Sequence, residues 1–120
     1  MKRLIILLAF ISFSCNDDND DDVYCTEDLR AGLVVVVKDA STGEVLGEGV
    51  TVTATDGEYS DELYFIASHN HFVGAYERAG DYVLTVEKEG YADFTSEVIP
   101  VDEDECHVIT ENVTVQLQPE

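Results

Sequence analysis

The chain of 120 residues carries 26 acidic and 6 basic side chains, for a formal net charge of −20 at pH 7. This excess of negative charge argues against nucleic acid and anionic lipid headgroups as partners. Hydrophobic residues make up 45% of the sequence, which is enough for a packed core and excludes global disorder. The length predicts a single domain behind a leader.

Residues 1–14 have the layout of a secretory signal peptide. The basic residues Lys2 and Arg3 precede an apolar run at positions 4–11, and the small side chains of Ser12 and Ser14 follow it. The run is too short to cross a membrane as a helix, which needs about 20 apolar residues. We therefore expect an exported protein whose leader is removed before Cys15.

Cys15 directly follows the expected cleavage point, and this arrangement resembles the lipobox of bacterial lipoproteins. The resemblance implies that Cys15 receives lipid, becomes the mature N-terminus and anchors the chain in the outer membrane. Ser14 fits the small residue of that pattern, whereas Ser12 and Phe13 depart from it. Ser12 and Ser14 also suit ordinary signal-peptide cleavage at the same bond.

Residues 15–24 form an acidic segment between the leader and the predicted domain. Its run of Asp and Asn at positions 16–22 is similar to the signals that route some lipoproteins to the outer face of the outer membrane. The same run also suits a plain solvated tether, because like charges repel and extend the chain. Both interpretations predict a location in the cell envelope, with the anchored protein possible on either face of the outer membrane.

Residues 25–120 predict an all-β domain. Tyr82, Leu84 and Val86 alternate with smaller or more polar side chains, and this period of two places them on the core face of a central strand. The continuous apolar run at positions 33–37 predicts a strand covered on both faces. Further strands are expected at residues 50–55, 59–66, 71–77, 91–101 and 107–118. This spacing, without a helical period, predicts an antiparallel β-sandwich of about seven strands.

Two sequence landmarks resemble carboxypeptidase regulatory-like domains. The first reads Val37-x-Asp39-x-x-Thr42-Gly43-Glu44-x-Leu46-x-x-Gly49-x-x-Val52, and the second reads Ala79-Gly80-Asp81-Tyr82-x-Leu84-x-Val86-x-x-x-Gly90-Tyr91. Together they cover most of residues 32–118. The resemblance implies a transthyretin-like (prealbumin-like) β-sandwich. It also implies a module without catalysis, because in carboxypeptidases this module sits beside the catalytic domain.

The cysteine count predicts one disulfide bond. The chain has 3 cysteines, and lipid on Cys15 leaves Cys25 and Cys106 in an oxidising compartment. An even number of cysteines in such a compartment indicates a bridge. The alternative is a pair of unpaired thiols that pack as small hydrophobic groups.

Three histidines and two acidic clusters are candidate metal ligands. His69 and His71 could share one strand face, with His107 or a carboxylate completing a zinc site. Histidines in short polar loops commonly have no such role. The acidic clusters could bind calcium or serve only as a solvated surface. They comprise Asp56, Glu58, Asp61 and Glu62 in one segment and residues 102–105 in the other.

Aromatic residues in the middle of the chain are candidates for stacking against sugar rings. Five of them fall within 18 positions, and the alternative is that most fill the core. They are Tyr59, Tyr64, Phe65, Phe72 and Tyr76.

The sequence therefore favours a non-catalytic, lipid-anchored β-sandwich module of the cell envelope, acting in adhesion or as an accessory interaction domain. We expect the membrane as one partner, through Cys15, and an unidentified protein or glycan as the other. The alternative is a carbohydrate- or calcium-binding module of the same architecture. A metal-dependent enzyme would require His69, His71 and a third ligand to meet in a pocket. No cofactor is expected.

Overall fold

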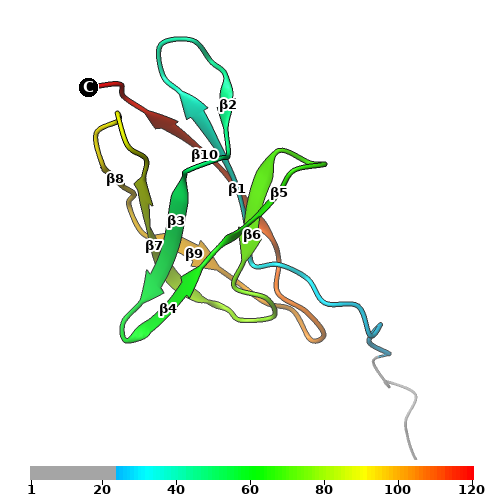
Figure 1. Ribbon diagram of the computed structural model, residues 1–120. Coiled ribbons are helices and arrows are strands. Elements are labelled where there is room, and N and C mark those ends of the chain that lie inside the picture. Colours follow the sequence, from blue (N-terminus) through cyan, green and yellow to red (C-terminus); the bar gives the residue numbers. More distant parts are fainter. Residues whose placement is uncertain (1–23) are drawn as a thin grey trace, which may run out of the picture.

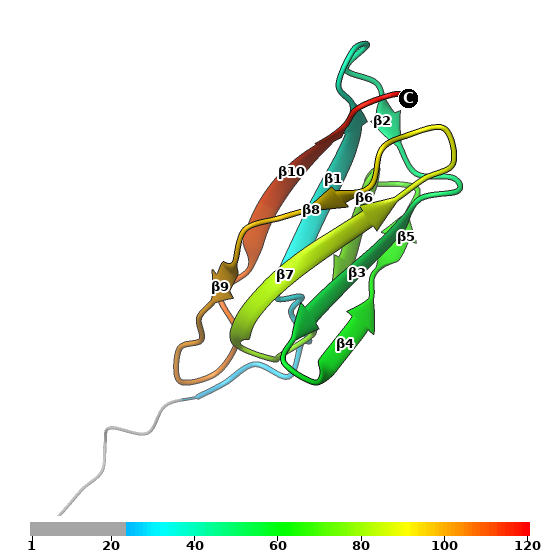
Figure 2. The same cartoon turned by 90° about the vertical axis from the view of Figure 1, so that its left-hand side faces the viewer.

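The structure is a computed structural model that describes residues 24–120. The predicted signal peptide, Cys15 and the acidic run at 16–22 lie outside the described residues. Within residues 24–120 the secondary structure is all β, and no helix there is long and apolar enough to cross a membrane. Two sheets pack face to face, which confirms the predicted β-sandwich (Figures 1 and 2).

The first sheet has the strand order β10-β1-β6-β5, with β2 paired to β1. The second has the order β4-β3-β7-β8, with β9 paired to β7. The strands of the first sheet are β1 (Leu33–Asp39), β2 (Val45–Leu46), β5 (Tyr64–Ile66), β6 (His71–Gly74) and β10 (Glu111–Leu117). Those of the second are β3 (Thr51–Asp56), β4 (Tyr59–Glu62), β7 (Gly80–Glu87), β8 (Phe94–Thr95) and β9 (Ile99–Val101).

The pairing differs from the prediction in one respect, because β1 and β10 run parallel. Their register joins Leu33 to Glu111 and Asp39 to Leu117, whereas all other strand pairs are antiparallel. The last strand therefore returns beside the first after the chain has crossed between the two sheets, a non-local pairing that hydrophobic periodicity alone does not indicate.

The core lies between β1 and β7. Tyr82, Leu84 and Val86 of β7 are fully buried, as their alternation predicted. Leu33, Val35 and Val37 of β1 face them and are also fully buried. The expectation that β1 is covered on both faces is wrong, since its residues alternate between buried and half-buried positions. Its outer valines, which the apolar run did not distinguish from the inner ones, lie on the outward face of the sheet.

Two predicted strands are each split into two, and those predicted at 71–77 and 107–118 are shorter, at 71–74 and 111–117. The predicted strand at residues 59–66 divides into β4 and β5, because the chain passes from one sheet to the other at Leu63. The Leu63 backbone N–H donates to the carbonyl of Val52, and its side chain is buried in the core. The predicted strand at residues 91–101 supplies only the short strands β8 and β9.

Asp39 joins the two sequence landmarks. Its Oδ1 accepts hydrogen bonds from the backbone N–H of Ser41 at 2.7 Å and of Thr42 at 3.0 Å, which closes the turn after β1. Its Oδ2 accepts from the hydroxyl of Tyr91 at 2.6 Å. Gly90, with φ of 89°, allows the turn that brings Tyr91 back to this position. One carboxylate thus ties the β1–β2 turn to the segment after β7.

These contacts change the acid–base behaviour of both partners. The hydrogen bond from Tyr91, followed by those from Ser41 and Thr42, holds the pKa of Asp39 well below its ordinary value of 3.8. The same bond raises the pKa of Tyr91 above 10.0. A carboxyl group with a lowered folded-state pKa stabilises the fold above its ordinary pKa, and this contribution is lost as the pH falls through the folded-state value.

We predict that Asp39→Asn lowers the urea midpoint at pH 7, because the amide weakens the acceptor and removes the charge. The difference from the wild type should shrink as the pH falls below about 4, where the wild-type carboxylate progressively loses its advantage. Tyr91→Phe should lower the midpoint less, since it removes one of several donors. Asp93→Asn, which neutralises an exposed carboxylate nearby, serves as the control. A difference that does not change between pH 7 and pH 2 would contradict this role.

Candidate functional site

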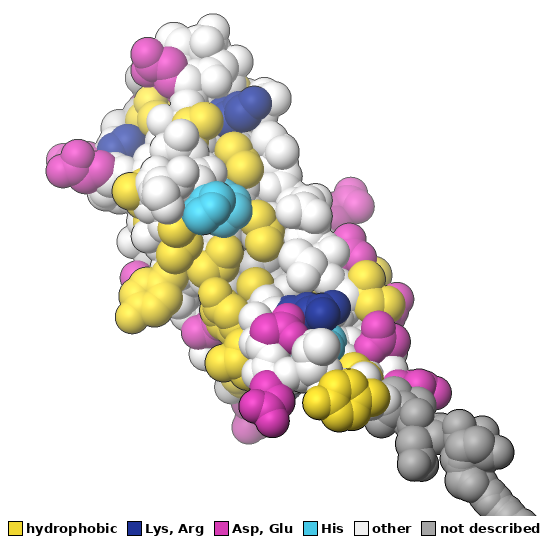
Figure 3. Space-filling model, turned by 90° about the vertical axis from the view of Figure 1, so that its right-hand side faces the viewer, with side chains coloured by type: hydrophobic (Ala, Val, Ile, Leu, Met, Phe, Trp, Pro, Cys, Tyr) yellow, Lys and Arg dark blue, Asp and Glu magenta, His cyan; other side chains and the backbone are white. Residues whose placement is uncertain are grey.

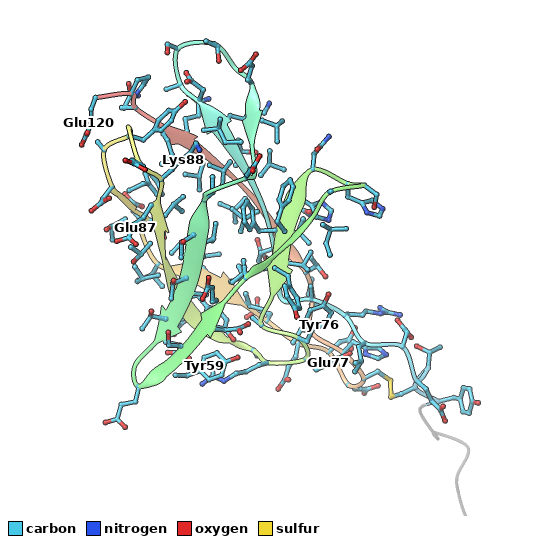
Figure 4. All side chains as sticks on the ribbon, viewed as in Figure 1. Tyr59, Tyr76, Glu77, Glu87, Lys88 and Glu120 are labelled. Carbon is cyan, nitrogen blue, oxygen red and sulfur yellow. A yellow bond between two sulfur atoms is a disulfide. The ribbon has the colours of Figure 1, made fainter. Side chains whose placement is uncertain are left out.

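Cys25 and Cys106 form a disulfide bond with a Cα–Cα distance of 5.2 Å. The structure thus confirms the pairing expected from cysteine parity. The bond fastens the segment before β1 to the loop between β9 and β10, at the end of the sandwich where residues 24–31 join it (Figure 1). Figure 4 draws the disulfide as a yellow bond at this end of the molecule, where the labelled Glu77, in the turn between β6 and β7, also lies.

His107, directly after the disulfide, is the centre of a polar cluster at this end. Its side chain is only 8% exposed, and its Nδ1 lies 2.6 Å from Oε2 of Glu77. Its Nε2 lies 3.1 Å from Oγ1 of Thr26. The backbone N–H groups of Cys106 and His107 both donate to Oδ1 of Asp104 at 2.9 Å. The loop that carries the disulfide is therefore held by its own hydrogen bonds.

Glu77 connects the remaining parts of the cluster. It has φ of 53°, in the left-handed region that residues with a Cβ rarely adopt, and its backbone N–H donates to the Arg30 carbonyl at 2.9 Å. Its carboxylate accepts from the N–H groups of Arg30 at 3.0 Å and Val108 at 3.3 Å. Burial raises the pKa of Glu77, but hydrogen bonds from His107 and these backbone groups outweigh it and lower the pKa overall.

The His107 ring lies between the hydroxyl of Thr26 and the carboxylate of Glu77, so a hydroxyl, a base and an orienting carboxylate follow one another. This is the order of a nucleophilic triad. However, the Thr26 hydroxyl also makes a short hydrogen bond to Oδ1 of Asp28. Hydrogen bonds from Thr26 and Arg30 hold the pKa of Asp28 well below its ordinary value, so this carboxylate is an acceptor at neutral pH. The single hydroxyl proton of Thr26 therefore points to Asp28 and not to His107, which is not the arrangement that nucleophile activation requires.

The structure does not bring the three candidate zinc ligands together. His69 and His71 stack with ring centroids 5.3 Å apart and an interplanar angle of 13°, at the turn between β5 and β6. His107 lies apart from them, in the polar cluster beside the disulfide. We call this group of Thr26, Asp28, Glu77 and His107 the disulfide cluster. Figure 3 shows histidine atoms at two separate places. Among residues 24–120, no three His, Cys, Asp or Glu side chains are placed to hold a metal ion.

Members of both predicted calcium clusters already accept hydrogen bonds from the protein. Asp56 pairs with Arg78 at 3.1 Å, and Oδ2 of Asp61 accepts from the Ala75 N–H at 2.8 Å. In the second cluster, Asp104 binds the backbone of the disulfide loop. These carboxylates shape the β3–β4 hairpin, the β6–β7 turn and the β9–β10 loop.

The candidate aromatic platform divides into packed and exposed rings. Phe72 is buried and lies 4.9 Å from the Phe65 ring centroid, while Tyr59 packs edge-on against Tyr82. Tyr64 and Tyr76 remain 74% and 47% exposed. Both line one pocket of about 580 Å³, together with Asp61, Glu62, Leu63, Val73 and Gly74. This volume falls within the range of ligand pockets, about 300–1,000 Å³.

No protein-family model matches the chain, and no curated protein matches it either. The two places where functional side chains gather are therefore defined by geometry alone. The first, the disulfide cluster, combines Thr26, Asp28, Glu77 and His107 from three separate segments, a combination that no local sequence pattern indicates. The second is the pocket of Tyr64 and Tyr76. The sequence analysis singled out these tyrosines, and separately Asp61 and Glu62, but not their meeting in one pocket.

We predict that the double substitution Cys25→Ser and Cys106→Ser destabilises the domain. The bond closes a loop with a sequence separation of 81, and the chain-entropy model sets an upper limit of about 4–5 kcal/mol on the loss. Urea unfolding of both proteins measures the difference, with Cys15→Ser as the control that leaves the bond intact. Two titratable thiols in protein purified without reductant would contradict the bridge.

Proposed function

We propose that this protein is a non-catalytic, lipid-anchored interaction module of the cell envelope, of the carboxypeptidase regulatory-like type. Its role is adhesion or assistance to a partner protein or glycan at the outer membrane. The observation that carries the proposal is the Cys25–Cys106 disulfide, because such bonds persist in oxidising compartments outside the cytoplasm. The leader and the cysteine at position 15 agree with that location.

The position of the disulfide suits an anchored protein. Cys25 lies ten positions after Cys15, the proposed lipid attachment site. A force applied at the anchor would be transmitted by the disulfide to the loop before β10. The hydrogen bond between Arg30 and Glu77 would transmit it to the turn after β6. The C-terminus and the β1–β2 loop lie at the opposite end of the sandwich (Figure 1). An anchored molecule therefore presents that end and its sides to partners.

The hydrogen bonds of Thr26, the hydroxyl placed most like a catalytic nucleophile, support the proposal that the protein is not an enzyme. In the disulfide cluster, Thr26 donates its proton to Asp28 and not to His107. The His107 ring is held between Thr26 and Glu77 and links three segments of the chain. We therefore assign the disulfide cluster a structural role, as the fastening between the anchor segment and the sandwich.

Carbohydrate binding is the second candidate function, and the exposure of Tyr64 and Tyr76 favours it. An exposed tyrosine presents a flat apolar ring to a sugar and a hydroxyl to its oxygen atoms. The other three aromatic candidates pack against neighbouring aromatic rings. Among the five candidate rings, Tyr64 and Tyr76 are thus the two available to stack against a sugar, at the pocket that they line.

We predict that an alkyne analogue of a fatty acid labels the wild type in growing cells and that the labelled protein fractionates with membranes. Cys15→Ser should be unlabelled and soluble, while its Cys25–Cys106 bond stays oxidised. The double variant Cys25→Ser and Cys106→Ser should still be labelled. Equal labelling of the wild type and Cys15→Ser would refute the anchor.

We also predict that the purified chain hydrolyses p-nitrophenyl acetate no faster than its Thr26→Ala variant. Treatment with a metal chelator, followed by zinc, should leave both rates unchanged. The measurement is the initial rate of nitrophenolate release at pH 7–9. A rate that falls with Thr26→Ala, or one abolished by the chelator and restored by zinc, would show that the protein is an enzyme.

A further inference from the structure

We propose that the pocket of Tyr64 and Tyr76 binds an arginine or lysine side chain of a basic partner peptide. This inference rests on the proposed interaction function and specifies its partner. The pocket lies where the chain crosses from β4 to β5, with Leu63 and Val73 contributing apolar walls. Both of these side chains are buried, so the pocket has a packed floor. Figure 3 shows hydrophobic side chains gathered on the side of the molecule that carries β5 and β6.

The two tyrosines are positioned by the fold. Tyr64 stands opposite Val73 in the register of β5 and β6. Tyr76 lies between Ala75 and Glu77, which have φ of 55° and 53°. The Ala75 N–H is held by Asp61 at 2.8 Å and the Glu77 N–H by the Arg30 carbonyl at 2.9 Å. This turn directs the Tyr76 side chain to the surface, although Ala75 beside it is fully buried.

All charged side chains that line the pocket are negative. They are Asp61 and Glu62, the last two residues of β4, of which Glu62 is exposed. A cation in the pocket is attracted by these lining carboxylates, of which Asp61 also accepts a hydrogen bond from the Ala75 N–H, and it is attracted by the face of a tyrosine ring. An anionic ligand is repelled, and a neutral sugar gains only hydrogen bonds from its hydroxyls to the carboxylates, without the attraction between opposite charges. The chemistry of the lining therefore favours a guanidinium or ammonium group.

The protein already holds one of its own arginines in this way. The guanidinium of Arg78 lies 3.8 Å from the ring centroid of Tyr59, and its Nη1 is 3.1 Å from Oδ2 of Asp56. Tyr59 and Glu62 are the two ends of the same strand, β4. A tyrosine ring and a carboxylate thus cradle a cation at one end of β4, and the pocket repeats these side-chain types at the other end.

The neighbouring strands favour a peptide over a free cation. β4 and β5 are the terminal strands of their sheets. A terminal strand presents backbone groups with which an extended peptide can pair. A peptide alongside these strands could place a basic side chain in the pocket between them. The partner is therefore best described as an extended segment with exposed arginine or lysine side chains.

The test uses the full chain, purified without reductant, and a fluorescent peptide with two arginines separated by one valine. A second peptide carries citrulline, the neutral analogue of arginine, at both positions. Fluorescence anisotropy should show binding of the arginine peptide only, and this binding should weaken as NaCl is raised from 50 to 500 mM. Glu62→Gln and Tyr64→Ser should each raise Kd about two- to fivefold.

Two matched variants separate the pocket from general attraction to an acidic surface. Glu58→Gln removes an exposed charge at the β3–β4 turn, and Tyr24→Ser removes a ring that is 92% exposed outside the pocket. Neither should change Kd. Equal effects of Glu58→Gln and Glu62→Gln, or equal binding of the citrulline peptide, would overturn the proposal.

Neutral oligosaccharides provide the remaining comparison. Chemical shifts of the Gly74 and Tyr76 amides should move with the arginine peptide and not with gluco-, manno- or xylo-oligosaccharides. Shifts with a sugar alone would overturn the basic-peptide proposal but leave the proposed interaction function standing. Fatty-acid labelling and ester hydrolysis test that function separately, so the failure of either proposal can be recognised.

Discussion

The burial of β1 against β7 is the constraint on which the rest of the sandwich depends. Three side chains from each strand, including Leu33 and Tyr82, are removed completely from water. Burying a side chain of this size contributes about 1.5–3 kcal/mol. β1 pairs directly with β2, β6 and β10, and β7 pairs with β3, β8 and β9. Only β4 and β5 are attached through an intermediate strand, and their junction carries the tyrosine-lined pocket.

The two ends of the sandwich are stabilised by different chemistry. At the end where the described chain begins, a disulfide bond and the buried ring of His107 join three segments. At the other end, Asp39 gathers donors from its own turn and from Tyr91. The first end therefore depends on oxidation, while the second depends on an ionised carboxylate. Reduction should loosen the first end alone. Acid should weaken both ends, because the pKa values of Glu77, in spite of its burial, and of Asp104 at the first end are also lowered by their hydrogen bonds.

The fold class could be predicted because hydrophobic core residues alternate along a strand with clearly polar or smaller residues. Along β7, polar or smaller residues separate the core side chains, so the buried face can be identified. Along β1 both faces are valine, and periodicity cannot tell Val34 from Val35. The division of residues 59–66 depends on Leu63 entering the core between two strands, which is a tertiary effect.

In the candidate sites, too, some features could be predicted from the sequence, whereas contacts between residues far apart in the chain could not. Parity was enough to pair Cys25 with Cys106, because the expected lipid on Cys15 would leave a single possible bridge. The contact of Glu77 with His107 spans 30 positions, and that of Thr26 with His107 spans 81. Ala75 and Glu77 adopt left-handed backbone angles without being glycine, so composition did not reveal the turn that exposes Tyr76.

The parallel pairing of β1 with β10 has a consequence for how the chain reaches this structure. Leu33 pairs with Glu111, so the first sheet lacks one of its strands until residues 111–117 are available. Contacts between such distant positions slow folding, because the entropy of closing a long loop is lost before the contact forms. A partly synthesised chain thus lacks the strand that covers one edge of β1. The order of the strands itself therefore makes completion of the first sheet wait for residues 111–117.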